Sequence, residues 1–172
     1  MAVIDAYTDA LVAAGKKGNP GNIMPGQVFG FAGTFEIAAA DSDGSKYRIA
    51  RIGANMIPMS LSVMADDAID VTTVDVGLYL AGAGGAVVDA DCFADAIDID
   101  TDTVDTADLA SNALFSLPID DIGKKCWEIT AVKAAGSYTD ANHPSEFDIV
   151  ITAKSEPGAA ATVSYRGLFL QG

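Results

Sequence analysis

Basic residues are scarce in this sequence. It contains 10 Lys and Arg residues against 24 Asp and Glu residues in a chain of 172, so its formal net charge is −14. The basic residues are scattered, and their only doublets are Lys16-Lys17 and Lys124-Lys125. A protein that binds a phosphate backbone or an anionic membrane surface needs a basic stripe or cluster. We therefore expect no binding to nucleic acid or membrane, and the charge favours a basic protein surface as partner.

Histidine and cysteine, which carry much of enzyme chemistry, are also nearly absent. His143 is the one histidine, and it lies in a turn-like DANHPS cluster, where we expect an exposed loop side chain. Cys92 and Cys126 stand alone in apolar surroundings, without a Cys-x-x-Cys spacing, so we expect two buried, reduced thiols. We predict no catalytic residues, no cofactor and no enzymatic activity.

Long apolar segments are missing as well. The longest uncharged apolar run, residues 76–88, is rich in glycine, flanked by Asp75 and Asp89, and too short to cross a bilayer. The N-terminal MAVIDAYTDALVAAGKK has acidic residues where a signal peptide has a basic region and an apolar core. We therefore expect a protein that is made in the cytoplasm and contains no membrane-spanning segment.

Strand patterns dominate what is present. Apolar and polar residues alternate with a period of two over residues 47–52, 59–64 and 74–80, which is the pattern of half-buried strands. Gly82, Gly84 and Gly85 predict a hairpin turn after the third of these runs. Further strands are expected over residues 27–31, 34–37, 96–99, 126–132, 147–153 and 162–170. Many short strands with frequent turns predict an all-β, jelly-roll-like antiparallel sandwich over residues 27–172.

The first 26 residues differ from this pattern. Ile4, Tyr7, Leu11 and Ala14 follow a helical spacing, and a Gly/Asn/Pro-rich connection comes after them. We predict a short N-terminal helix or arm over residues 1–26, packed on its own domain or on a neighbouring subunit. Helical turns are also expected over residues 106–115 and 117–123.

Residues 89–108 form an acidic belt, and Asp98, Asp100 and Asp102 alternate within it. Alternating carboxylates can gather around calcium, but an EF-hand loop would need Gly at position 103 and Glu at position 109, which hold Thr103 and Leu109. We therefore predict no metal site and a solvated acidic surface, with these three residues as a weak calcium candidate. A carboxylate pair for glycoside hydrolysis remains open.

Trp127 allows two interpretations. The alternation in CWEITAV favours a core anchor, whereas an exposed ring could stack on a sugar.

Six segments together resemble the head decoration (cement) proteins of tailed bacteriophages. They are KYRIARI (46–52), MSL (59–61), TVDVGLY (73–79), GAVVDADCFA (85–94), IGKKCWE (122–128) and EFDIVIT (146–152). The resemblance covers most of residues 46–153 and leaves out the N-terminal region and residues 95–108 of the acidic belt. It implies a jelly-roll-like sandwich that forms a homotrimer on the outer surface of the virion and clamps neighbouring subunits of the major capsid protein.

The resemblance brings no catalytic motif and names no partner-binding residue. Met64 and Tyr79, which the alternation places on outward strand faces, are candidates for trimer contacts. The residues themselves leave a second function open, namely a carbohydrate-binding or adhesin-like sandwich. Such a module could depend on calcium bound through Asp98, Asp100 and Asp102.

Overall fold

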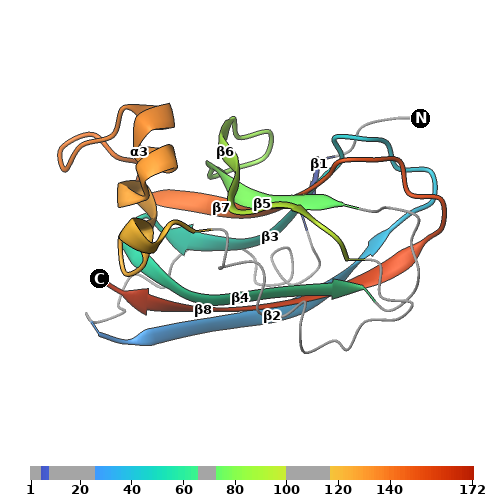
Figure 1. Ribbon diagram of the computed structural model, residues 1–172, viewed down its shortest axis with the longest axis horizontal. Helices are drawn as coiled ribbons and strands as arrows, with labels where there is room; N and C mark the ends of the chain where they lie inside the picture. The colour runs from blue at the N-terminus through green and yellow to red at the C-terminus, as the bar shows by residue number, and fades with distance from the viewer. Residues whose placement is uncertain (1–4, 8–25, 66–72, 100–116) are drawn as a thin grey trace.

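The computed structural model describes residues 5–7, 26–65, 73–99 and 117–172. They form two β-sheets packed face to face, as Figure 1 shows. The five-stranded sheet has the order β1-β3-β7-β5-β6, and the three-stranded sheet has the order β2-β8-β4. The predicted all-β sandwich is confirmed, and its jelly-roll connectivity stays a prediction.

The strands of the two sheets are long, and nearly all of them pair in antiparallel fashion. In the five-stranded sheet they are β1 Asp5–Tyr7, β3 Lys46–Gly53, β7 Glu146–Ala153, β5 Val74–Leu80 and β6 Val87–Ile97. In the three-stranded sheet they are β2 Val28–Ile37, β8 Ala161–Gln171 and β4 Met56–Ala65. The exception is β1, which runs parallel to β3.

Alternation along the strands creates the core between the sheets. Every second residue of β2, including Phe29, Phe31 and Phe35, turns toward the opposite sheet, and these rings pack against the buried core. Phe31 stacks on Phe169 of β8 with ring centroids 5.8 Å apart, and Phe93 of β6 meets Phe169 edge to face at 6.3 Å. The aromatic rings thus fill the space between the two layers.

The predicted hairpin at Gly82–Gly85 is confirmed, but the strand after it is irregular. Leu78 pairs with Asp89 and Val76 pairs with Ala94, so β6 contains three more residues than β5 over this stretch. The extra residues form a bulge over Gly77, where an added Cβ would collide with the backbone of Asp89 and Ala90. In Figure 1 this part of β6 and helix α3 rise from the five-stranded sheet on the side away from the three-stranded sheet.

The strand predicted over residues 126–132 is wrong. These residues form the 3-10 turn η2, Cys126–Glu128, and the start of the helix α3, Thr130–Gly136. Cys126, Ile129 and Val132 are buried at a spacing of three, which suits one face of a helical turn, whereas the strand prediction rests on Trp127, Ile129 and Ala131 alternating with Glu128 and Thr130. The Glu128 carboxylate accepts a hydrogen bond from the Lys125 backbone amide at 3.1 Å, and this contact favours the helical alternative.

The outcomes of four other predictions of local secondary structure differ from one another. The helix expected around Ile4 and Tyr7 is wrong for Asp5–Tyr7, which pairs with β3, because backbone pairing at a sheet edge overrides a short helical pattern. The two strands expected over residues 27–37 are one continuous strand, β2. The separate strand expected over residues 96–99 is the end of β6. The turn expected over residues 117–123 is present as the 3-10 turn η1, Ile119–Asp121.

Several predictions concern the rest of the chain. The helical turn expected over residues 106–115 and most of the N-terminal arm lie outside the described residues. The division into an arm at residues 1–26 and a domain at residues 27–172 stays a prediction. Within the described ranges, no helix is long and apolar enough to cross a membrane.

Candidate interaction surface

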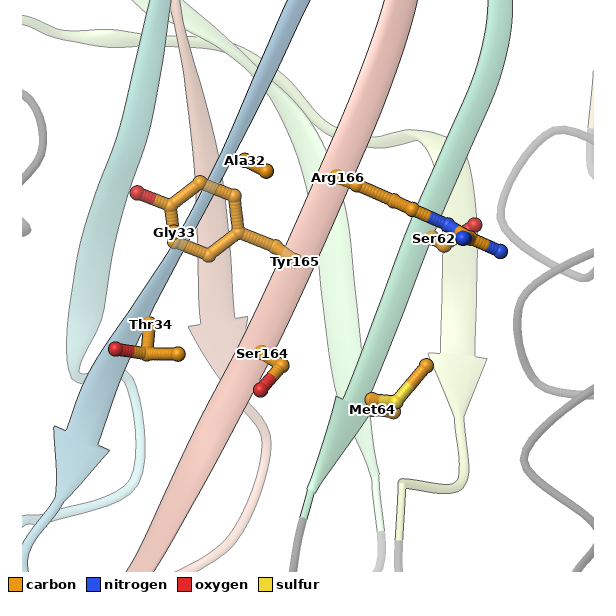
Figure 2. Close-up of a pocket in the computed structure, with 8 residues that line it drawn as sticks. All are labelled: Ala32, Gly33, Thr34, Ser62, Met64, Ser164, Tyr165 and Arg166. Atoms are coloured by element: carbon orange, nitrogen blue, oxygen red, sulfur yellow. The ribbon is translucent and has the colours of Figure 1, made fainter.

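The outer face of the three-stranded sheet carries small side chains. Residues that point away from the core alternate with core residues on each strand, and they form a shallow open hollow. Figure 2 shows the residues around it, which come from all three strands: Ala32, Gly33 and Thr34 of β2, Ser62 and Met64 of β4, and Ser164, Tyr165 and Arg166 of β8. The described helices and strands leave this face uncovered in Figure 1. We call it the flat face, defined by the outward residues of β2, β4 and β8.

One end of the flat face is apolar. Val28 is 56% exposed, Met59 52% and Leu168 46%. The pairing register places Ile57 and Val28 on either side of Leu170, next to Leu168. Exposed aliphatic side chains on adjacent strands form a contiguous patch, which is the usual mark of a contact surface.

The flat face is almost free of charge. β2, β4 and β8 together contain one acidic residue, Glu36, and one basic residue, Arg166. Glu36 accepts a hydrogen bond from the Thr162 hydroxyl at 2.8 Å. Arg166 is exposed, and its side chain extends from β8 across Ser62 of β4 (Figure 2). The acidic residues of this chain therefore lie almost entirely elsewhere.

The five-stranded sheet has a different outer side, which contains a buried ion cluster. Asp148 and Arg48 have fully buried side chains, and the Arg48 Nη1 lies 3.3 Å from the Asp148 Oδ2. Arg51 donates to both carboxylate oxygens, at 2.7 and 3.1 Å, and the amide of Gly82 donates at 3.0 Å. Arg48 also donates to the carbonyl oxygen of Gly85 at 3.0 Å. The cluster fastens the β5–β6 hairpin to β3 and β7, which is a structural task.

The structure describes only part of the acidic belt. Asp98 is exposed, whereas Asp100 and Asp102 lie outside the described residues, so the calcium candidate stays a prediction. Across the described ranges, no three His, Cys, Asp or Glu side chains gather in a way that could hold a metal ion. Lys154 bridges Asp75 and Asp95, with its Nζ 3.1 and 3.0 Å from their carboxylate oxygens.

Asp89, at the start of the acidic belt, has a carboxyl group with a raised pKa. Burial raises the pKa of its carboxyl to about 6, and a hydrogen bond with the Asp91 side chain adds to the effect. The Asp91 backbone amide also donates to Asp89 Oδ1 at 3.3 Å.

Trp127 is a core anchor, as the first of its two interpretations predicts. It is 3% exposed, and its Nε1 donates to the Asn55 Oδ1 at 3.1 Å. His143 is half-buried and not an exposed loop residue, because its ring stacks on Trp127 with centroids 4.7 Å apart. His143 Nδ1 lies 2.8 Å from the Pro144 carbonyl oxygen. This arrangement gives both rings a packing role.

The two cysteines are buried and free, as predicted. Burial raises the pKa of both thiols, which makes them poor nucleophiles.

The two residues expected on outward strand faces have different positions. Tyr79 is 2% exposed, so the prediction that it contacts another subunit of a trimer is wrong. It faces outward from its sheet, but the Arg48 guanidinium lies 5.6 Å from its ring centroid and its hydroxyl lies 3.0 Å from the Thr152 hydroxyl. Met64 is half-buried at the rim of the hollow on the flat face.

Sequence reasoning does not single out Arg166 or the flat face. The available signal is the lack of acidic residues in three strand segments of a chain with net charge −14. That signal becomes visible only when the pairing β2-β8-β4 joins segments that lie far apart in the sequence.

No known family model and no curated protein sequence matches this chain. Its fold is nevertheless found in solved phage structures. A chain from the capsid of Ralstonia phage GP4 matches with a TM-score of 0.54 and 15% identity, covering 97% of this chain and 99% of that chain. A chain from the cyanophage Pam1 capsid asymmetric unit matches with a TM-score of 0.50 and 14% identity, covering 93% of this chain and 96% of that chain. This chain therefore shares its fold, nearly from end to end, with chains of two phage capsids.

Proposed function

We propose that this protein is a structural component of a bacteriophage head, where it decorates the outer capsid surface as a homotrimer and stabilises contacts between neighbouring major capsid subunits. The observation that carries the proposal is the fold match, which spans almost the whole of both compared chains. The resemblance of six segments to head decoration proteins points the same way and comes from the sequence alone.

The physics of a shell supports such a role. A capsid presents the same site many times, so a binder with several contact sites needs only a modest affinity at each of them. A specific interface buries roughly 1,200–2,000 Å². A sandwich with a broad sheet face that no described helix or strand covers offers a surface of the type that such contacts need.

The described charged groups support a role without catalysis. Asp148 and Arg48 form a fully buried structural cluster, and Lys154 forms ion pairs with both Asp75 and Asp95. His143 packs on Trp127. These groups are engaged in holding elements together, which fits a structural protein.

The direct test uses heads of a phage in which the gene for this chain has been deleted. Purified protein should bind these heads to saturation and raise the temperature at which they release their DNA. Saturation should give one constant number of copies per head. Absence of binding at protein concentrations that saturate comparable interfaces would overturn the proposal.

The acidic belt is our proposed contact with basic loops of the capsid. Replacing Asp98, Asp100 and Asp102 together with Asn should weaken head binding and make the affinity less sensitive to salt, because charge pairs at a surface are screened by ions. Replacing the exposed Asp43, Asp120 and Asp140 together with Asn changes the net charge by the same amount and serves as the control. An unchanged salt dependence in the triple variant would remove this contact from the proposal.

A further inference from the structure

We propose that the flat face is the surface through which two copies of this chain associate. This inference rests on the self-association that the proposed function includes, and it names the surface through which the copies meet. It can be tested without any capsid.

Charge is the first argument for a second copy as the occupant. Each copy has a formal net charge of −14, so two copies repel each other wherever their acidic surfaces meet. Opposed like charges at an interface weaken association. The flat face contains one acidic residue, Glu36, which is hydrogen-bonded to Thr162. The flat face is therefore a surface on which copies can approach each other with little repulsion.

Exposed apolar area is the second argument. Val28, Met59 and Leu168 are about half exposed and lie at the same end of the sheet. The centres of protein interfaces are depleted in charged residues and enriched in apolar area. The small residues Ala32, Thr34 and Ser164 beside this patch let a second backbone come close. The composition of the face is thus that of an interface centre.

Arg166 is the third argument. Among the described residues no hydrogen-bond or ion-pair partner of its guanidinium is found, although the protein carries 24 acidic residues. It is the one basic residue of the three strands, and it lies beside the hollow in Figure 2. Arg is enriched at interfaces because its planar group can bind a carboxylate with two hydrogen bonds. Glu36 on the flat face of a second copy offers such a carboxylate.

The strand at the border of the flat face adds a fourth observation. β2 pairs with β8 over ten residues without a register shift, and no described strand pairs with its other edge. It contains no proline, whereas β4 at the opposite edge carries Pro58 and a register shift next to it. Prolines and bulges protect edge strands against pairing with other chains. The edge that borders the flat face at β2 lacks this protection.

The experiment is a solution mass measurement on the full chain over a wide range of protein concentrations, by light scattering and sedimentation. The wild type should form a complex that is larger than the 17.6 kDa monomer. Leu168→Asp places an acid in the apolar patch and should weaken association by at least about tenfold. Val87→Asp is the matched control, since Val87 is 56% exposed on β6 of the other sheet, and it should associate like the wild type.

Circular dichroism and thermal unfolding check that each variant is folded. If Leu168→Asp does not fold, Val28→Asp tests the same patch, because Val28 is also 56% exposed there. A wild type that is monomeric at every concentration would overturn the inference, and so would patch variants that associate like the wild type. If heads fail to bind a self-associating wild type, only the proposed function is overturned. If a monomeric wild type binds heads, this inference and the homotrimer are overturned, and the decorating role stands.

Discussion

Asp148 is the residue on which the outer side of the five-stranded sheet depends. Its buried carboxylate accepts hydrogen bonds from Arg48, Arg51 and the Gly82 amide. Asp148→Asn should lower the free energy of unfolding by ~3–5 kcal/mol, because it leaves the buried charge of Arg48 without its partner. Denaturant unfolding measures this loss.

The control for Asp148→Asn is Glu146→Gln on the same strand. Glu146 is half-buried and lies outside the ion cluster, so its loss should cost less than about 1 kcal/mol. Equal losses in the two variants would show that the cluster adds nothing beyond a change in net charge.

Asp89 gives stability a dependence on pH. Its pKa is raised from an ordinary 3.8 to about 6 in the folded protein, so the folded state holds a proton that the unfolded state has already released. The resulting stabilisation is fully present below pH 3.8 and is lost as the pH rises through about 6. Asp89→Asn should therefore gain stability relative to the wild type as the pH rises across this window.

Thermal unfolding at a series of pH values measures the difference between Asp89→Asn and the wild type. Asp120→Asn, at an exposed position, controls for the loss of one negative charge. A difference between Asp89→Asn and the wild type that stays constant across this pH range would contradict the raised pKa of Asp89.

At the scale of elements, Gly77 sets how closely β6 can lie on β5. A Cβ at this position would collide with the backbone of Asp89 and Ala90, and backbone atoms cannot move aside as a side chain can. Gly77→Ala should therefore cost about 1–3 kcal/mol of stability, as overpacking does elsewhere.

Gly30→Ala is the matched control on β2. The nearest atom to its added Cβ is the end of the Leu168 side chain at 3.2 Å, which can rotate away. Denaturant unfolding should give a near-neutral change. A cost at Gly30 equal to that at Gly77 would contradict the close approach of β6.

Elements also show where prediction from sequence fails. The spacing of Cys126, Ile129 and Val132 fits a helical face, yet Trp127, Ile129 and Ala131 in the same short window also match strand alternation. At Asp5–Tyr7 the local pattern is helical, and pairing with β3 decides the outcome. Both cases are short segments whose state depends on the neighbours that they meet in the fold.

At the scale of the whole molecule, calcium distinguishes the proposed function from a calcium-dependent binding module. We expect neither calcium nor EDTA to change the unfolding temperature or the solution mass, because Asp98 is exposed and the described acidic residues form no metal cluster. A calcium-induced rise in the unfolding temperature would reveal a site, since a ligand stabilises the state that it binds. Loss of that rise in the Asp98, Asp100 and Asp102 variant would place the site in the acidic belt.

The sequence by itself determines the class of this protein. Alternation with a period of two is a local property of the chain, so it indicates β2, β3, β4, β5, β7 and β8 without knowledge of their partners. Composition fixes the net charge of −14 in the same way. The burial of Cys92, Cys126 and Trp127 also follows from local apolar context.

Only the tertiary structure decides which surfaces exist. Tyr79 points away from the core of its sheet, yet Arg48 and Thr152 cover it, and both come from other strands. Arg166 stands in a neutral face because β8 pairs with β2 and β4, which are distant from it in sequence. The physical reason is that burial and charge density are sums over neighbours in space, whereas a sequence pattern reports only neighbours along the chain.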